Sequence, residues 1–444
     1  MKLHKALAIS LLLLSPLGAR AGEPQAPAPP PQSWWKGFAD PVLDSLVYLG
    51  QNANLNLSQA MHSLEMARQS VREAKSAYYP ALNLGLGWNR ARTSAFTSSP
   101  RGESMTDSYF SLGVNMSWEI DLFGRITAKV REAKGALKAS AQDYEWMCVT
   151  VAADIATYYM DLRTLQQQYS VTSDHIAQQE EVLKITEARY EAGLASKLDV
   201  AQAKTVFYST QASLLTLLTQ IIADINALAL LTSSMPGPRQ EWLSVPAPQP
   251  SAEWTLDVSL DADMLRRRPD VLEAEYKVEE AAAALGYEKK QWLPSLSLSA
   301  SVGTEAWHLG DLFKGDSFTY SVAPQLSWTI FDGLARDASI ASAREALLSA
   351  VDSYNYALLS AVQEVDNALT AYTQAVRYEQ EIAVVLENAR LAYTLALDRY
   401  RQGLDAFINV SDALITVLQY ANELVSARGQ VLSSLITLQK SIIL

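Results

Sequence analysis

The stretch from Ala335 to Gln402 contains neither glycine nor proline, and no other feature limits the possible folds as strongly. Its apolar residues recur at alternating steps of three and four, the heptad spacing of a helix with one apolar seam. These positions are Leu347, Val351, Tyr354, Leu358, Ala361, Val365, Ala368, Tyr372, Ile382, Leu386, Ala389, Tyr393, Ala396 and Tyr400. At about 1.5 Å per residue, roughly 65 helical residues form a rod on the order of 100 Å long. A compact globular domain has no room for such a rod.

The first half of the chain contains a similar seam. It begins near Ile126 and continues through Val130, Ala133, Leu137, Ala141, Tyr144, Cys148, Val151, Ile155, Tyr158, Leu162, Leu165 and Tyr169. Each rod ends in nearly the same phrase, "RYEAGLASKLDV" from Arg189 and "RYRQGLDAFINV" from Arg399. A repeat of this kind indicates that one structural unit is used twice.

The repeated phrase predicts the tip of a helical hairpin. Gly193 and Gly403 are expected to end the rods, because glycine adopts the left-handed conformation of a helix C-terminal cap at little cost. Helical patterns resume almost at once, at 198–231 and at 408–440. Each half of the chain is therefore predicted to contain a long helix and a shorter return helix.

A different period precedes each rod. Apolar residues alternate there with Ser, Gly and Asn, as in a strand with one apolar face. The apolar set is Leu82, Leu84, Leu86, Trp88, Phe110, Leu112, Val114, Met116 and Trp118, then Leu296, Leu298, Ala300, Val302, Tyr320, Val322, Pro324, Leu326 and Trp328. We predict two strand pairs, at about 82–118 and 295–328, the first with a polar loop at about 90–107. Pro324 predicts a bulge or an edge strand, because proline cannot donate to a neighbouring strand.

The N-terminus has the pattern of a secretory signal. Lys2 and Lys5 precede the apolar run 6–14, and small residues around Arg20 predict cleavage after Ala21. That run is shorter than the roughly 20 residues of a spanning helix, and we expect no other stretch to span a membrane as a helix. The predicted segments are a signal peptide at 1–21, a Pro-rich lead at 22–40, a first repeat at 41–231 with its tip at 192–197, a connector at 232–262 and a second repeat at 263–440 with its tip at 402–407.

Composition argues against several function classes. The net charge of −12 argues against a nucleic-acid partner, because an acidic surface repels phosphate. Cys148 is the single cysteine, and it suits packing better than nucleophilic chemistry. The histidines His4, His62, His175 and His308 lie in unrelated segments without metal-ligand spacing. "GLGWNR" resembles the start of a dinucleotide loop but lies inside an alternating strand. We therefore expect no enzyme activity, no metal and no cofactor.

The strands point to a membrane. Four strands cannot close a barrel, and an open sheet edge cannot lie in lipid because its unpaired backbone groups would lack water. Closure then needs several chains, and a trimer's twelve strands would leave a lumen. Trp88, Trp118 and Trp328 fit an aromatic belt at the membrane interface. The alternative is a soluble sandwich in which helices cover the apolar faces.

The chain resembles the TolC-like outer membrane efflux proteins, in particular those serving resistance-nodulation-division pumps. The matching phrases are "WWKGFADPVLDSL", "SWEIDLFGR", "LRRRPDVLEAEY", "WLPSLSLSAS", "LSWTIFDGLAR" and the two tips. The resemblance implies an α+β membrane protein in the outer membrane of a Gram-negative bacterium. It implies a trimeric 12-stranded β-barrel, four strands per chain, that continues into an α-helical tunnel across the periplasm. It also implies the exit duct of a tripartite efflux system, docked to a periplasmic adaptor and an inner-membrane transporter.

The resemblance also implies site residues. Contact with the adaptor falls on Gly193, Leu194, Ala195 and Ser196 and on Gly403, Leu404, Asp405 and Ala406. A tunnel gate falls on Ile408, Asn409 and Asp412. Some relatives carry two acidic residues in the gate, so Asn409 argues against a double carboxylate ring, and Asp412 alone is also an ordinary acidic residue near a helix start. Close relatives carry a lipid on a cysteine after the signal, whereas Gly22 follows the predicted cut, so we expect no lipidation.

Two other functions remain open at this stage. One is an exit duct for a type I protein secretion system. The other is a coiled-coil structural protein of the cell surface, against which the strand pairs between the rods argue.

Overall fold

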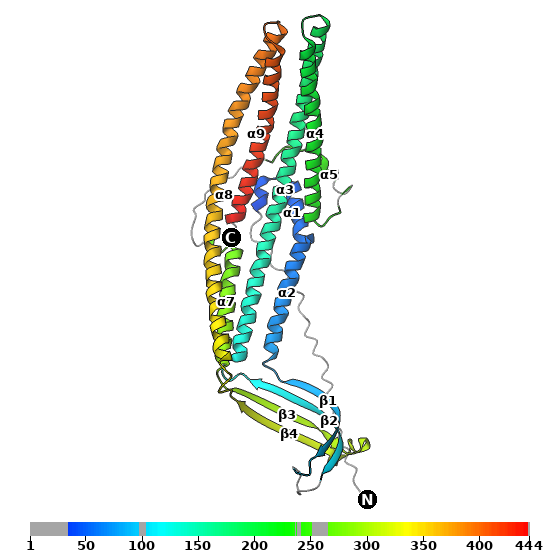
Figure 1. The fold of residues 1–444 in the computed structure, drawn as a ribbon, viewed down its shortest axis with the longest axis vertical. Coiled ribbons are helices and arrows are strands. Elements are labelled where there is room, and N and C mark those ends of the chain that lie inside the picture. Colours follow the sequence, from blue (N-terminus) through cyan, green and yellow to red (C-terminus); the bar gives the residue numbers. More distant parts are fainter. Residues whose placement is uncertain (1–33, 97–103, 236, 238–240, 251–264, 443–444) are drawn as a thin grey trace.

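A computed structural model describes residues 34–96, 104–235, 237, 241–250 and 265–442, except the side chain of Glu241. The predicted signal peptide, its cleavage site and most of the Pro-rich lead lie outside the described residues, as does much of the predicted connector. The described chain is a long helical rod with a sheet at one end and two hairpin tips at the other (Figure 1).

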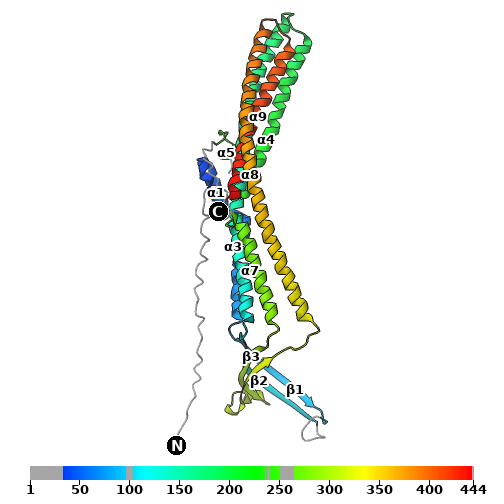
Figure 2. The same ribbon diagram turned by 90° about the vertical axis from the view of Figure 1, so that its left-hand side faces the viewer.

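Two helices of 67 residues each run the length of the rod, α3 (Arg125–Glu191) and α8 (Ala335–Arg401). Shorter helices lie beside them (Figures 1 and 2). The half nearer the tips contains α4 (Lys197–Leu231) and α9 (Phe407–Ile442), and the half nearer the sheet contains α2 (Leu55–Ser76) and α7 (Pro269–Lys290). Each long helix is therefore accompanied along its whole length by two short ones.

Both long helices begin after a residue in the left-handed conformation. Before α3 this residue is Gly124, with φ 75°, whereas before α8 it is Leu334, with φ 71°. The side chain of Asp121 accepts hydrogen bonds from the backbone N–H groups of Ile126 and Thr127, at 2.9 Å each, and so satisfies free donors of the first turn.

The strands form one antiparallel sheet in the order β1-β2-β3-β4. Its members are β1 (Ala81–Thr93), β2 (Met105–Ile120), β3 (Ser295–Ala306) and β4 (Phe318–Ser327). The expectation of four strands per chain is confirmed. The predicted loop at 90–107 was too long, because β1 continues to Thr93 and β2 begins at Met105. Pro324 lies in β4, which is an edge strand, as its missing N–H requires.

The sheet has one apolar face that runs across all four strands. One row of pairs joins Leu84, Val114, Val302 and Tyr320. On the other face, the next row joins Gly85, Gly113, Gly303 and Thr319. Leu84 and Tyr320 are each 77% exposed, and within the described residues no helix covers either face (Figures 1 and 2). The alternative of a soluble sandwich capped by the chain's own helices is therefore wrong.

Glycine is required where β2 and β3 meet. A Cβ atom added to Gly303 would lie 2.5 Å from the backbone oxygen of Leu112 and 2.7 Å from the Cα of Gly113. Such contacts are far below van der Waals distance, so the two backbones approach one another only because both residues lack side chains.

The largest apolar core lies at the middle of the rod. There η1 (Trp34–Phe38) and α1 (Pro41–Ala53) pack against α3 (Figure 2). Arg268 ties four helices together at this level. It pairs with Asp270 and Glu364 at 2.7 Å, donates to the backbone oxygen of Ser441 at 3.0 Å and lies 5.2 Å from the Trp146 ring. A buried guanidinium satisfied in this way positions α7, α8 and α9 around α3.

The middle of the rod also joins the two hairpins. A Cβ atom on Gly429 of α9 would lie 2.5 Å from the hydroxyl oxygen of Thr164 of α3, so these helices cross in close contact. Gln249 of the connector donates to that hydroxyl at 2.9 Å and to the backbone oxygen of Val425 at 3.1 Å. The connector therefore links α3 and α9 at the point where they cross.

One expectation about membranes needs correction. By length and composition α4 could cross a membrane, with a mean hydropathy of 1.9 over its most apolar window, although we expected no such stretch after the signal. Only 22% of that window is buried in the single chain. The apolar side chains that α4 leaves exposed are Leu198, Tyr208, Leu215, Leu218, Ile222 and Leu230.

Candidate functional site at the hairpin tips

The two tips share one helix-ending motif. Gly193 and Gly403 have φ of 73° and 76°, in the left-handed region. At the first tip the N–H of Gly193 donates to the oxygen of Tyr190, and the N–H of Leu194 donates to the oxygen of Arg189 at 2.7 Å. The second tip makes the same two bonds with residues 399–404. This is a Schellman motif, and it explains why both phrases place glycine at the same point.

The return helices begin differently at the two tips. At the first tip Ser196 caps α4 in a capping box, since its hydroxyl accepts from the N–H of Asp199 and its own N–H donates to that carboxylate. At the second tip Asp405 accepts from the amide of Asn409 at 2.5 Å and from the N–H of Ala406 at 2.9 Å. The hydrogen bond from Asn409 lowers the pKa of Asp405, and the bond from Ala406 adds to this effect.

The residues predicted to contact a partner are well placed to do so. Leu194 and Leu404 project into solvent at 68% and 64% exposure. A Cβ atom added to Gly193 would meet nothing within 4 Å, and one added to Gly403 would meet only the side chain of Arg189, at 3.7 Å. Both tips thus present small backbone turns with one exposed leucine each.

The predicted gate residues share one exposed surface of α9. Ile408, Asn409 and Asp412 are exposed, whereas Val410 and Ser411 between them are buried. Asn409 is held by its bond to Asp405, and Asp412 forms no ion pair with any residue that the structure describes. What these side chains face in an assembly stays a prediction.

A link between the two hairpins escaped the sequence analysis. The guanidinium of Arg189 lies 4.7 Å from the centre of the Tyr400 ring and donates to the backbone oxygens of Tyr400 and Arg401, at 3.0 and 3.3 Å. It therefore places a cation at the C-terminus of α8, where the helix dipole favours one. Its counterpart Arg399 binds Asp405 of its own tip instead. The repeat drew attention to both arginines, but nothing local revealed a partner 211 residues away.

An apolar cluster supports this link. Tyr400 and Phe407 are each 3% exposed, and their ring centres lie 5.8 Å apart. They pack with Val410 and Leu414 of the second hairpin and with Val182, Leu183 and Ala203 of the first. The two tips of one chain are therefore a single packed unit.

The tryptophans lie at two levels of the sheet. Trp118 and Trp328 lie at the end next to the helices, where their indole N–H groups donate to the backbone oxygens of Tyr78 and Trp292 at 3.0 Å. Trp88 lies within β1, seven residues from Ala81, or roughly 23 Å at about 3.3 Å per residue. An apolar band about 25 Å tall between aromatic girdles is typical of outer membrane barrels.

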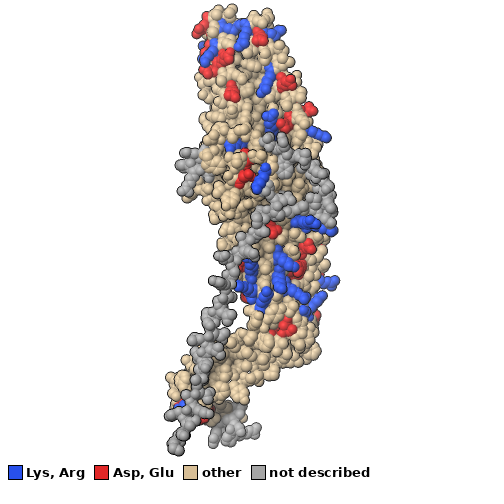
Figure 3. Space-filling view, turned by 180° about the vertical axis from the view of Figure 1, so that it is seen from behind, with Lys and Arg blue, Asp and Glu red and all other residues tan. Residues whose placement is uncertain are grey.

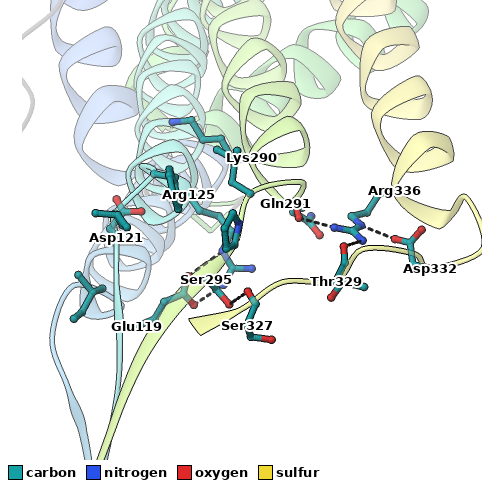
Figure 4. A pocket seen from close by; sticks show the side chains of 15 residues that line it. Glu119, Asp121, Arg125, Lys290, Gln291, Ser295, Ser327, Thr329, Asp332 and Arg336 are labelled. Carbon is teal, nitrogen blue, oxygen red and sulfur yellow. Dashed lines mark hydrogen bonds and ion pairs between the residues drawn. The ribbon is translucent and has the colours of Figure 1, made fainter. Parts of the chain in front are cut away.

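A cavity of about 270 Å³ lies between the sheet and the starts of α3 and α8 (Figure 4). Its charged side chains neutralise one another. Arg125 pairs with Glu119, Arg336 pairs with Asp332 at 2.6 Å, and Lys290 donates to the backbone oxygen of Gly124 at 2.8 Å. This cavity is a joint between sheet and rod with no free reactive group.

The described residues offer no support for a catalytic site at a metal ion or at the single cysteine. They contain no group of three or more His, Cys, Asp or Glu that could hold a metal ion. Cys148 is buried, which raises the pKa of its thiol to about 11 and keeps it protonated at neutral pH.

The chain is similar to outer membrane proteins of efflux pumps. A family described as outer membrane efflux protein matches residues 46–234 and 262–442. The toluene efflux pump outer membrane protein TtgF of Pseudomonas putida is 30% identical over 92% of this chain and 85% of its own. The antibiotic efflux pump outer membrane protein ArpC of Pseudomonas putida is 28% identical over 93% of this chain and 84% of its own.

Solved structures agree with these relatives. The outer-membrane channel OprN superimposes with a TM-score of 0.86 at 25% identity, over 92% of this chain and 91% of OprN. The outer membrane protein VceC of Vibrio cholerae has the same fold, with a TM-score of 0.85 at 24% identity, over 92% of this chain and 98% of VceC.

We expect the change Arg189→Gln to loosen the tips. The variant loses two hydrogen bonds to the end of α8 and a cation at its negative pole, together worth about 1–3 kcal/mol. Amide hydrogen exchange in residues 396–412 should therefore quicken by about tenfold. Arg390→Gln, which removes an exposed charge from α8 about two turns away, serves as the control. Equal exchange in wild type and the Arg189 variant would show that the link contributes nothing to tip packing.

Proposed function

Because the chain belongs to the outer membrane efflux protein family, we propose that it is the outer membrane exit duct of a tripartite efflux system. The family is one of channel proteins rather than enzymes. The observation that carries the proposal is a sheet with an uncovered apolar face and two unpaired edges at the end of a rod on the order of 100 Å long. The apolar face suits the hydrocarbon of a lipid bilayer, and the length of the rod suits a periplasm.

The unpaired edges favour a closed assembly. In lipid, each unpaired N–H or C=O group of β1 and β4 would cost several kcal/mol. Pairing β4 of one copy with β1 of the next removes every edge, and three copies give a twelve-stranded barrel with a lumen. The face of Ser, Gly and Asn residues would then line the lumen and the apolar face would meet lipid.

The helices support the same assembly. In Figure 1, α4 and α8 lie at opposite margins of the half near the tips. Both leave apolar side chains exposed at this level, which in the case of α8 include Tyr378, Val384, Leu391 and Leu395. If neighbouring copies place α4 against α8, these side chains are buried and the helices close into a tunnel.

The tips are proposed to meet a periplasmic adaptor. Residues 193–196 and 403–406 offer small turns with exposed leucines, which suits close packing against another helical hairpin. The energy for transport would come from an inner-membrane transporter, and this chain would conduct passively. Relatives named as efflux pump proteins favour small-molecule export over a type I protein secretion system.

The gate is proposed at Ile408, Asn409 and Asp412. Three copies of Asp412 around one axis would repel anions and hold cations between them. Three copies of Ile408 would narrow the tunnel with apolar side chains. The support is their exposure on one surface of α9, next to the tip.

The barrel predicts disulfides between copies. Within one chain, three strand spacings of about 4.8 Å separate β1 from β4, or roughly 14 Å, twice the Cα distance that a disulfide spans. In a Cys148→Ser background, we expect Asn83→Cys combined in turn with Thr319→Cys, Ser321→Cys or Ala323→Cys to give covalent dimers and trimers in at least one pair after oxidation. Each single-cysteine variant is the control. Monomers in all three pairs would refute the twelve-stranded barrel.

The gate predicts a change in ion block. Replacing Asp412 with Asn keeps the shape of the side chain and removes its charge. We expect the calcium concentration that blocks half of the current across a planar bilayer to rise by about tenfold. Asp398→Asn, the same change at an exposed position of α8, should leave the block as it is. An unchanged block in the Asp412 variant would exclude the carboxylate ring.

Docking at the tips predicts a loss of export without a loss of assembly. In the protein's own host, we expect Gly193→Trp with Gly403→Trp to abolish efflux of a fluorescent dye while trimers remain on native gels. Gly193→Asn with Gly403→Asn is the matched control, because Asn tolerates the left-handed conformation and is less bulky. Should the Trp variant fail to assemble, the glycines serve folding, and normal export by an assembled Trp variant would refute docking at these turns.

A further inference from the structure

The helix ends next to the sheet carry an excess of positive charge. In a chain of net charge −12, the four segments that adjoin the sheet contain thirteen Lys and Arg against eight Asp and Glu, in residues 63–76, 125–138, 277–290 and 335–348. Segments of equal length next to the tips contain seven of each, in residues 178–191, 197–210, 388–401 and 407–420. Figure 3 shows the Lys and Arg side chains gathered over the half of the rod nearer the sheet, with few acidic ones among them.

Part of this charge is already neutralised, and part is not. Lys138 pairs with Glu279 at 2.7 Å, for example. In contrast, Arg72, Lys75, Arg131 and Lys289 are exposed and form no ion pair with any described residue. We call these four residues the basic collar.

The basic collar lies close to the sheet. Lys75 and Lys289 belong to the last turns of α2 and α7, which end at the sheet. Arg72 and Arg131 lie four and six residues from the ends of their helices, or about 6 and 9 Å along the axis. All four are therefore within about one Debye length of the level where the sheet begins.

The helix dipole accounts for only part of the basic collar. Lys75 and Lys289 do complement the C-terminal ends of α2 and α7. However, α3 begins at the same level, and there the dipole favours acidic residues. Its first turn contains none, and Arg131 follows in the second turn. With Asp121 as the acidic cap of α3, the helix dipole accounts for Lys75 and Lys289 but leaves Arg72 and Arg131 unexplained.

Exposed apolar side chains lie between the basic collar and the sheet. They belong to the turns that join strands to helices and are Tyr79, Leu122, Phe123, Trp292, Ile330 and Phe331. Phe331 is 78% exposed and Tyr79 73%. Aromatic residues at such a level mark the headgroup region of a bilayer. The basic collar lies on the helices, just beyond these apolar turns on the side away from the sheet.

We propose that the basic collar binds the phosphate headgroups of anionic phospholipids in the periplasmic leaflet of the outer membrane. The proposal rests on the proposed function, because it requires the sheet to span that membrane. With the sheet in the hydrocarbon and the apolar turns at the interface, the four cations reach the headgroup phosphates. Each cation near an anionic surface strengthens binding by about fivefold. In a trimer the collar would form a complete ring of such sites.

The test compares lipid preference in two variants of equal charge. One carries Gln at Arg72, Lys75, Arg131 and Lys289. The control carries Gln at Lys184, Lys204, Arg377 and Arg390, which are exposed in the half near the tips. Purified trimers are reconstituted into vesicles of phosphatidylcholine or of an equal mixture with phosphatidylglycerol, and lipids retained after detergent extraction are counted by native mass spectrometry. We expect wild type and control to retain phosphatidylglycerol preferentially, and the collar variant to lose that preference by at least about tenfold.

Three results would overturn the inference. An equal preference for phosphatidylglycerol in all three inserted proteins would refute the basic collar and leave the exit duct standing. A collar variant that keeps this preference but no longer binds isolated cell-wall sacculi would assign the surface to the wall instead of to lipid. A wild-type chain that inserts into neither kind of vesicle would refute the proposed function and the collar together.

Discussion

The backbone groups at the two edges of the sheet impose the main constraint on this molecule. Among the residues that the structure describes, β1 and β4 each pair with one strand only, and no helix covers the apolar face of the four strands. Water could solvate the edges but not the face, and lipid could solvate the face but not the edges. The proposed pairing with strands of other copies would satisfy both at once. This conflict between hydrogen bonding and hydrophobic burial is what the proposed barrel resolves.

The helical rod transmits this arrangement to the tips. Within one chain the two hairpins are tied at two levels, by the close crossing of Gly429 and Thr164 at the middle of the rod and by Arg189 at the tips. Between these levels lie polar contacts such as the pair of Thr172 and Asn422. The first hairpin and the second are therefore held together at the middle of the rod and at the tips. Separation of the two tips would have to disrupt these contacts.

The distribution of side chains along the molecule follows the surroundings proposed for each level. The membrane level has apolar strands with an opposite face mainly of Ser, Gly and Asn, and the charged side chains of the strands lie toward their ends, with Glu119 next to the helices and Arg90, Arg92, Asp107 and Glu305 at the far end. The basic collar and the exposed aromatic turns lie at that boundary. The tips carry balanced charge and small turns, which suits contact with protein. The outer-membrane channel OprN, which shares the fold, agrees with this distribution.

Patterns within short stretches of the chain were enough to predict the helices, strands and tips. Heptad spacing, strict alternation and the glycines at 193 and 403 predicted the long helices, the strands and the tips to within a few residues, because each pattern reflects the local backbone geometry that sets where successive side chains point. Only the tertiary structure decided that β2 pairs with β3, that α4 leaves an apolar surface exposed, and that Arg189 binds the end of α8. These contacts join residues far apart in the chain, and their geometry depends on how whole elements pack. No local pattern encodes that packing.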